Sequence, residues 1–117
     1  MRDRGAASIF VLAIGLTLLA AGMAGAAVGA ARVARHEART AADLGALAGA
    51  QRAVDGPPTA CAEASRFVVA NGALMTSCDV RGLEVVIFVE VPTTLLPGLN
   101  RRARAGARAG PVYPILE

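Results

Sequence analysis

The sequence predicts an α+β protein in which a long N-terminal transmembrane helix continues beyond the membrane and is followed by a short helix packed on a small antiparallel sheet. Three observations lead to this class. Residues 6–31 contain no charge, residues 32–54 are alanine-rich and contain no proline, and residues 83–91 and 101–109 alternate in character along the chain. The first two patterns are typical of helices, and the third is typical of strands with one buried face.

The apolar run Ala6–Ala31 is long enough to cross a bilayer. It has 26 residues, whereas about 20 are needed to span a hydrocarbon core roughly 30 Å thick. A single spanning segment has to be helical, because every backbone polar group in lipid must be paired within the segment. Arginines flank the run on both sides: Arg2, Arg4, Arg32, Arg35 and Arg39. We therefore expect the lipid bilayer to be one partner of this chain.

The helix is expected to continue past the membrane to about Val54. Residues 32–54 are rich in alanine and other good helix formers, so one helix over residues 6–54 would be about 70 Å long. Asp55-Gly56-Pro57-Pro58 would end it. The predicted organisation is a basic leader, the transmembrane helix, its extramembrane continuation, a Gly/Pro linker and a small exported domain: residues 1–5, 6–31, 32–54, 55–59 and 60–117.

Glycines recur along the predicted helix at regular intervals. Gly15, Gly22 and Gly29 are seven residues apart, and Gly25 forms a GxxxG motif with Gly29. A second such motif follows at Gly45 and Gly49. Each glycine costs a helix about 1 kcal/mol relative to alanine, so the pattern favours close approach of another helix backbone. The alternative is a span that is merely rich in small residues.

The C-terminal domain is predicted to begin with a helix over residues 60–73, which Asn71-Gly72 would stop. Cys78–Val80 would then start a strand, and Arg81-Gly82 would form a turn. The clearest strand is Leu83–Val91, with one face made by Leu83, Val85, Ile87, Val89 and Val91.

The other face of that strand carries Glu84, Val86, Phe88 and Glu90. Pro92 is expected to end the strand, and residues 93–100 are expected to form a loop. Residues 101–109 predict a second strand, with arginine outward and alanine inward. Beyond Pro114 we expect a flexible tail.

Two cysteines, Cys61 and Cys78, have two possible interpretations. In a small exported domain a disulfide is the default, and closing a loop of about 18 residues would stabilise it by roughly 3 kcal/mol. The alternative is a pair of free buried thiols. A crosslink would suit this chain, because alanine is the largest contributor to its 55% apolar content and leaves little material for a large core.

Composition argues against nucleic acid, a cofactor, a metal or a small-molecule substrate. The net charge is +3, but the arginine-rich residues 101–108 lack the interleaved aromatics that stack on bases. The single histidine, His36, is followed by Glu37, and neighbouring residues on a helix do not face each other. Glu84 and Glu90 lie roughly 20 Å apart along a strand, which is too far for a pair of carboxylates acting on one bond. We expect both to be solvated. We therefore expect no enzyme activity.

Orientation is not settled by the flanking arginines, whose count leans slightly towards a cytoplasmic C-terminal domain. The cysteine pair and the very short N-terminal tail favour the opposite arrangement. We expect a single-pass protein of the cell membrane with its N-terminus in the cytoplasm and its C-terminal domain outside.

Residues 4–8, Arg-Gly-Ala-Ala-Ser, resemble the junction of a type IV prepilin, in which a short basic leader ending in glycine precedes an apolar helix that stays attached. Residues 34–50 are similar to the TadE/TadG-like family of Flp pilus assembly, in what looks like its actinobacterial type. Within them Ala-Ala-Asp-Leu-Gly-Ala-Leu-Ala, residues 41–48, is the most specific element. The resemblance covers about the first 50 residues.

The resemblance implies a minor pilin or pseudopilin that helps to assemble a Flp (Tad) type IV pilus or a related secretion apparatus. It implies cleavage between Gly5 and Ala6 by a prepilin peptidase, and contacts with other Tad-type pilins and the inner-membrane platform. Type IV pilins usually carry glutamate at the fifth mature position, where this chain has Phe10. That departure favours a subunit that does not polymerise by itself. The alternative is a generic single-pass anchor that presents a small extracytoplasmic binding domain.

Overall fold

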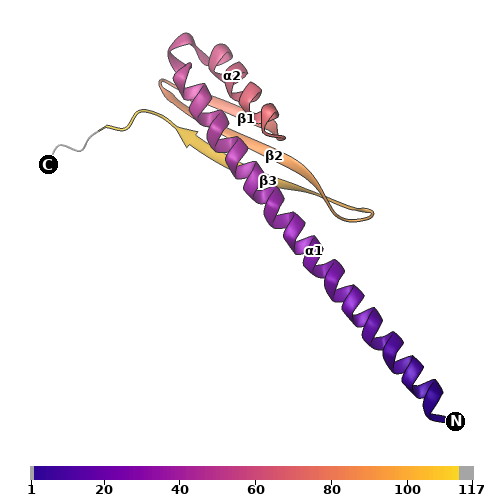
Figure 1. Ribbon diagram of the computed structural model, residues 1–117. Helices are drawn as coiled ribbons and strands as arrows, with labels where there is room; N and C mark the ends of the chain where they lie inside the picture. Colours follow the sequence, from indigo (N-terminus) through magenta and orange to yellow (C-terminus); the bar gives the residue numbers. More distant parts are fainter. Residues whose placement is uncertain (1, 114–117) are drawn as a thin grey trace.

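The computed structural model describes residues 2–113, and its side chains are described from Asp3 onward. The chain forms a long helix, a short 3-10 turn, a second helix and three strands (Figure 1). In chain order they are α1 (Arg2–Gln51), the 3-10 turn (Ala53–Asp55), α2 (Pro57–Ala70), β1 (Leu74–Arg81), β2 (Glu84–Leu96) and β3 (Leu99–Ala109). The predicted α+β class is confirmed. The expected tail beyond Pro114 lies outside the described residues.

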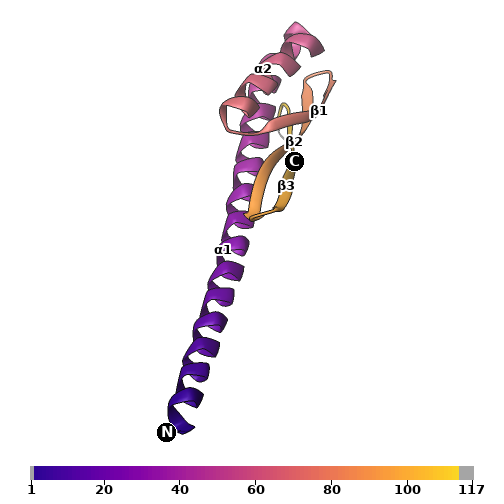
Figure 2. The same cartoon turned by 90° about the vertical axis from the view of Figure 1, so that its right-hand side faces the viewer.

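Helix α1 is a rod whose N-terminal half stands clear of the rest of the molecule (Figures 1 and 2). Residues 3–26 are all exposed, whereas most of the buried residues of α1 lie between Ala34 and Gly49. The radius of gyration is 23.0 Å, against about 13 Å for a compact domain of this length. We call everything after Gln51, together with the half of α1 that it covers, the head.

Within the head, α1 buries a stripe of very small side chains against the sheet and α2. The stripe follows the spacing of three and four residues that one face of a helix requires, and it contains Ala34, Ala38, Ala41, Ala42, Gly45, Ala46 and Gly49. Leu44 and Leu47 belong to the same stretch but are exposed on the far side. Small residues therefore face the head and larger ones face away from it.

The second glycine pair lets this close packing occur. A Cβ atom at Gly45 would lie 2.5 Å from Cγ2 of Val68 and 2.7 Å from Cδ1 of Ile87. A Cβ atom at Gly49 would lie 3.2 Å from the carbonyl oxygen of Ala60 on α2. For this pair, the helix that approaches closely is α2 of the same chain.

Helix α2 begins earlier than the sequence predicted. We expected residues 55–59 to form a linker, but Pro57 and Pro58 occupy the first turn of α2. Proline is well suited to this position, because the first N–H groups of a helix have no partner within the helix. The helix ends at Ala70, three residues before the predicted end, and Asn71 donates a hydrogen bond from Nδ2 to the carbonyl oxygen of Phe67 over 2.8 Å.

The sheet is antiparallel with the order β1-β2-β3, so β2 is central. We predicted that Pro92 would end the strand, and this was wrong: β2 continues to Leu96 and β3 begins at Leu99. The reason is that β1 pairs with β2 only as far as Glu90. Beyond Glu90, β2 is an edge strand, where the missing N–H of a proline is tolerated. Strand β1 also begins before the predicted start, at Leu74, with a bulge between Met75 and Ser77.

The core lies between the sheet and the two helices. Its large residues come from β2 and α2, and alanines fill the remaining positions: Val68, Val85, Ile87, Val89 and Val91 are at most 5% exposed. The predicted alternation of β3 is confirmed, because Ala103, Ala105, Ala107 and Ala109 pack against this core while the arginines stay exposed. Leu83 was expected on the same face but lies in the β1–β2 turn and is 46% exposed.

Candidate functional site

The expected processing junction lies within α1. The helix starts at Arg2, before the predicted start at Ala6, so Gly5 and Ala6 belong to its first two turns. Both residues are exposed, and a Cβ at Gly5 would meet nothing within 4 Å. Nothing in the described head covers this junction.

The apolar part of α1 satisfies its few polar groups internally. Ser8 donates a hydrogen bond from Oγ to the carbonyl oxygen of Arg4 over 3.0 Å, and Thr17 donates to that of Ala13 over 2.8 Å. Lipid has no water to satisfy a free hydroxyl, so this bonding suits a bilayer. Among the described residues, α1 is the one helix long and apolar enough to span a membrane.

The first set of glycines is open to a partner. Cβ atoms added at Gly15, Gly22, Gly25 or Gly29 would meet nothing within 4 Å. The surface over these four residues is therefore unoccupied by the chain itself, in contrast to Gly45 and Gly49. Contact with a helix of another protein stays a prediction for them.

The glycine face continues onto the head as an exposed apolar face. An α-helix completes five turns in 18 residues, and Val33 and Leu47 lie 18 residues after Gly15 and Gly29. Val33 and Leu47 therefore share the side of α1 on which the glycines lie, and they are 58% and 56% exposed. We call this side, made of Gly15, Gly22, Gly29, Val33 and Leu47, the outer face of α1. The sequence prediction did not connect the glycines with Val33 and Leu47, although the 18-residue spacing can be found in the sequence.

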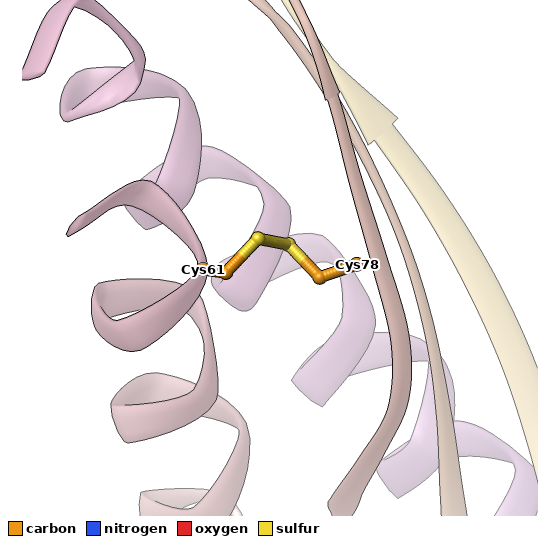
Figure 3. The surroundings of a disulfide bond; sticks show 2 residues. All are labelled: Cys61 and Cys78. Carbon is orange, nitrogen blue, oxygen red and sulfur yellow. A yellow bond between two sulfur atoms is a disulfide. The ribbon is translucent and has the colours of Figure 1, made fainter. Parts of the chain in front are cut away.

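A disulfide joins α2 to the sheet (Figure 3). It links Cys61 near the start of α2 to Cys78 in the middle of β1, with Cα atoms 6.0 Å apart. Both cysteines are therefore oxidised, which leaves no free thiol among the described residues. The crosslink fixes α2 over β1, whose Met75 and Val80 are only partly buried against the core.

The face of the sheet opposite the helices is an ionic and aromatic surface. We expected Glu84 and Glu90 to be solvated, but Glu84 pairs with Arg108 and Glu90 with Arg102, each over 2.7 Å. The Glu90 side chain is only 13% exposed. These partners come from β3, so they could not be assigned before the register of the hairpin was known. Between the two pairs, the ring of Phe88 lies over Gly106, whose added Cβ would be 2.6 Å from Cε1 of the ring.

Four arginines gather where α1 meets the edge of the sheet. Arg35 and Arg39 of α1 and Arg102 and Arg104 around the start of β3 line a cleft of about 450 Å³. From the sequence, Arg35 and Arg39 were interpreted as a flank of the membrane span, and Arg102 and Arg104 as the solvent-exposed face of a strand. The fold brings them together.

Residues that carry catalytic or metal chemistry do not converge in the part of the chain that the structure describes. His36 is exposed on α1, and no group of three His, Cys, Asp or Glu side chains among these residues is arranged to hold a metal ion. What the described surface offers is a projecting apolar rod, an outer face with small residues and a cluster of arginines. These are features of association with lipid and protein.

Comparison with known families gives one match. Residues 5–52 match the family described as putative Flp pilus-assembly TadE/G-like. No curated protein and no solved structure matches the chain. The matched segment begins three residues after the start of α1 and ends one residue after its end, so it covers nearly all of α1, including the half that packs in the head.

Proposed function

Because residues 5–52 match the family described as putative Flp pilus-assembly TadE/G-like, we propose that this chain is a membrane-anchored minor pilin or pseudopilin. It serves the assembly of a Flp (Tad) type IV pilus or a related secretion apparatus. The observation that carries this proposal is the coincidence of the family match with α1. The matched residues form a helix that is exposed and apolar enough to span a membrane at one end and is built into a folded head at the other.

The mechanism we propose is association through the outer face of α1. In lipid, burial of apolar surface does not drive helices together, so close van der Waals packing has to do so. Gly15, Gly22 and Gly29 lack side chains and meet nothing within 4 Å in the chain itself. A neighbouring pilin helix approaching there would gain backbone contacts that an alanine or leucine would prevent.

The proposed orientation places the N-terminus in the cytoplasm and the head outside the membrane. The disulfide between Cys61 and Cys78 supports this, because disulfides persist in oxidising compartments. A prepilin peptidase would cleave between Gly5 and Ala6, and α1 would then become the mature N-terminus. Phe10 stands where pilins usually carry glutamate, so the subunit would initiate, cap or anchor a fibre rather than form one alone.

The role we propose is structural and not catalytic. The partners are other Tad-type pilins, the inner-membrane platform, the prepilin peptidase and the bilayer. The exposed single histidine and the paired state of Glu84 and Glu90 support this reading. Nucleic acid, small-molecule substrates and cofactors have no part in it.

The test compares two substitutions that add the same side chain to opposite sides of the span. Gly22 lies on the outer face, and Ala24 lies two residues, or about 200°, further round the helix. We expect Gly22→Leu to weaken chemical crosslinking of the chain to other pilus components in cells that build the pilus. Ala24→Leu is the control and should leave the crosslinks unchanged.

Intact-mass analysis of the same preparations reads out processing. The proposal expects the mature chain to begin at Ala6 in cells with an active prepilin peptidase. Retention of residues 1–5 together with an absence of crosslinked pilus components would contradict it. That pair of results would support a generic single-pass anchor that presents a small binding domain.

A further inference from the structure

The turn between β2 and β3 has an unusual composition for an exposed hairpin. Residues 93–100 read Thr-Thr-Leu-Leu-Pro-Gly-Leu-Asn, with three leucines and no charge. Leu96 and Leu99 pair across a two-residue turn made by Pro97 and Gly98, where Gly98 has φ +84°. Leu99 is 41% exposed. We call residues 95–99 the hairpin tip.

The hairpin tip is a defined structure with an ordered neck. Proline followed by glycine at positive φ suits a tight turn. Directly behind the tip, Thr94 donates a hydrogen bond from Oγ1 to Oδ1 of Asn100 over 3.0 Å. The three leucines therefore lie within five residues of one another at the end of a paired ribbon, Leu95 and Leu96 half-buried and Leu99 exposed. Exposed apolar patches mark protein or membrane contact sites.

The hairpin tip lies at the end of the sheet nearest the N-terminal half of α1 in both views (Figures 1 and 2). Burial along α1 shows how far the head extends in that direction. Residues 3–26 are exposed, and the first half-buried residues are Ala27, Ala30 and Ala31. The head therefore covers α1 up to and including the last turn of the uncharged run, which ends at Ala31.

That level on α1 corresponds to the surface of a bilayer. The uncharged run of 26 residues is about 39 Å long as a helix, and the hydrocarbon core measures roughly 30 Å. About six residues of the run thus extend into the interfacial region. A head that reaches Ala27 cannot stay clear of the lipid into which α1 inserts.

Arginines form a girdle immediately behind the hairpin tip. The girdle combines the start of β3 with the first charged turns of α1 and contains Arg32, Arg35, Arg39, Arg101, Arg102 and Arg104. All six are exposed, and four of them line the cleft between α1 and β3. Arg102 pairs with Glu90, but the ion pairs among residues 2–113 include none with Arg101 or Arg104. Their guanidinium groups are available to phosphate oxygens.

We infer that the hairpin tip is a second membrane contact: Leu95, Leu96 and Leu99 enter the interfacial layer of the bilayer that α1 spans, and the arginine girdle binds its anionic headgroup phosphates. The inference rests on the proposed membrane span of α1. Apolar residues that enter lipid beneath a basic rim are the arrangement by which other proteins bind membrane surfaces. Two points of contact fix the tilt and rotation of the head above the membrane, which one helix alone would leave free.

Tryptophan fluorescence tests this directly, because the chain contains no tryptophan. Three single-tryptophan variants of the full chain would be reconstituted into phosphatidylcholine and phosphatidylglycerol vesicles, with and without brominated acyl chains that quench tryptophan on contact. Leu99→Trp probes the hairpin tip. Leu83→Trp is its matched control, because Leu83 occupies the β1–β2 turn at the other end of the sheet with a similar exposure of 46%. Leu16→Trp probes the middle of the span.

The inference expects Leu99→Trp to show a blue-shifted emission that brominated lipid quenches strongly, while Leu83→Trp keeps the emission of an exposed side chain and is not quenched. In the Leu99→Trp background, Arg101→Gln together with Arg104→Gln should reduce the quenching in anionic vesicles. If Leu16→Trp is quenched but Leu99→Trp is not, the inference is wrong while the span survives. In that case the hairpin tip contacts a neighbouring protein or water. If Leu16→Trp is also unquenched, the proposed membrane anchoring fails with it.

Discussion

Replacement of Gly45 by alanine sets two physical effects against each other, and the structure decides which one dominates. Alanine is favoured over glycine in a helix interior by about 1 kcal/mol. Its Cβ would, however, lie 2.5 Å from Cγ2 of Val68 and 2.7 Å from Cδ1 of Ile87, both fully buried. It would also lie 3.2 Å from the carbonyl oxygen of Ala64, which belongs to the backbone of α2.

Relief of these contacts requires α1 to move away from α2 and the sheet. Val68 is β-branched, so its side chain has little rotational freedom, and Ile87 is fully buried in the core. Overpacking of this kind costs about 1–3 kcal/mol. After the helix-propensity gain is subtracted, the upper part of that range leaves a net destabilisation of about 1–2 kcal/mol.

The control is Gly29→Ala, because a Cβ at Gly29 meets nothing within 4 Å. It carries the same chemical change without the overlap, so it should leave the head as stable as before. The assay is hydrogen exchange of the β2 amides between Val85 and Val91 in the full chain held in detergent. For Gly45→Ala we expect these amides to exchange about 5 to 30 times faster, which corresponds to 1–2 kcal/mol of lost opening free energy. Unchanged or slower exchange would refute the close packing of α1 on α2.

Two further predictions concern the crosslink and the ionic face of the sheet. The double variant Cys61→Ala with Cys78→Ala should lower the stability of the head by roughly 3 kcal/mol in the chain-entropy model. Thermal unfolding measures this as a lower midpoint temperature. Reductant should lower the midpoint of the unchanged chain but not that of the double variant. Glu84→Gln should change stability by less than about 0.5 kcal/mol, because both partners of its pair are well exposed. Glu90→Gln should cost about 1 kcal/mol, because its carboxylate is mostly buried while it accepts a hydrogen bond from Arg102. Equal effects of the two glutamate changes in chemical denaturation would contradict this ordering.

The parts of the fold that depend on local pattern were predictable from the sequence. The uncharged run and the alanine-rich stretch identified α1, and the alternation around Ile87 identified the buried face of β2. The end of β2 was not predictable. Pro92 is tolerated within this strand because the pairing with β1 stops at Glu90, before the proline. The point at which β1 stops depends on how the strands pair, and the sequence of one segment does not contain this information.

The candidate site, too, has features that the sequence predicted and features that depend on the fold. Gly45 and Gly49 were recognisable as points of close approach, but the sequence could not tell that α2 of the same chain fills them. The ion pairs of Glu84 and Glu90 and the meeting of Arg35 with Arg104 depend on hairpin register and on how α1 crosses the sheet. Residues that act together across elements are therefore the part that sequence reasoning missed.

The continuity of α1 couples its exposed apolar half to the half that packs in the head. Helical structure is unbroken from Arg2 to Gln51, and the stretch contains no proline, so rotation of the span about its axis must rotate the head by the same angle. The glycines of the outer face and the alanines that carry the sheet lie on different sides of this one rod. A partner helix bound at Gly22 would consequently determine which way the sheet faces outside the membrane. Contact of the hairpin tip with lipid would constrain the same rotation from the other end, so the two contacts would reinforce each other where their preferred angles agree.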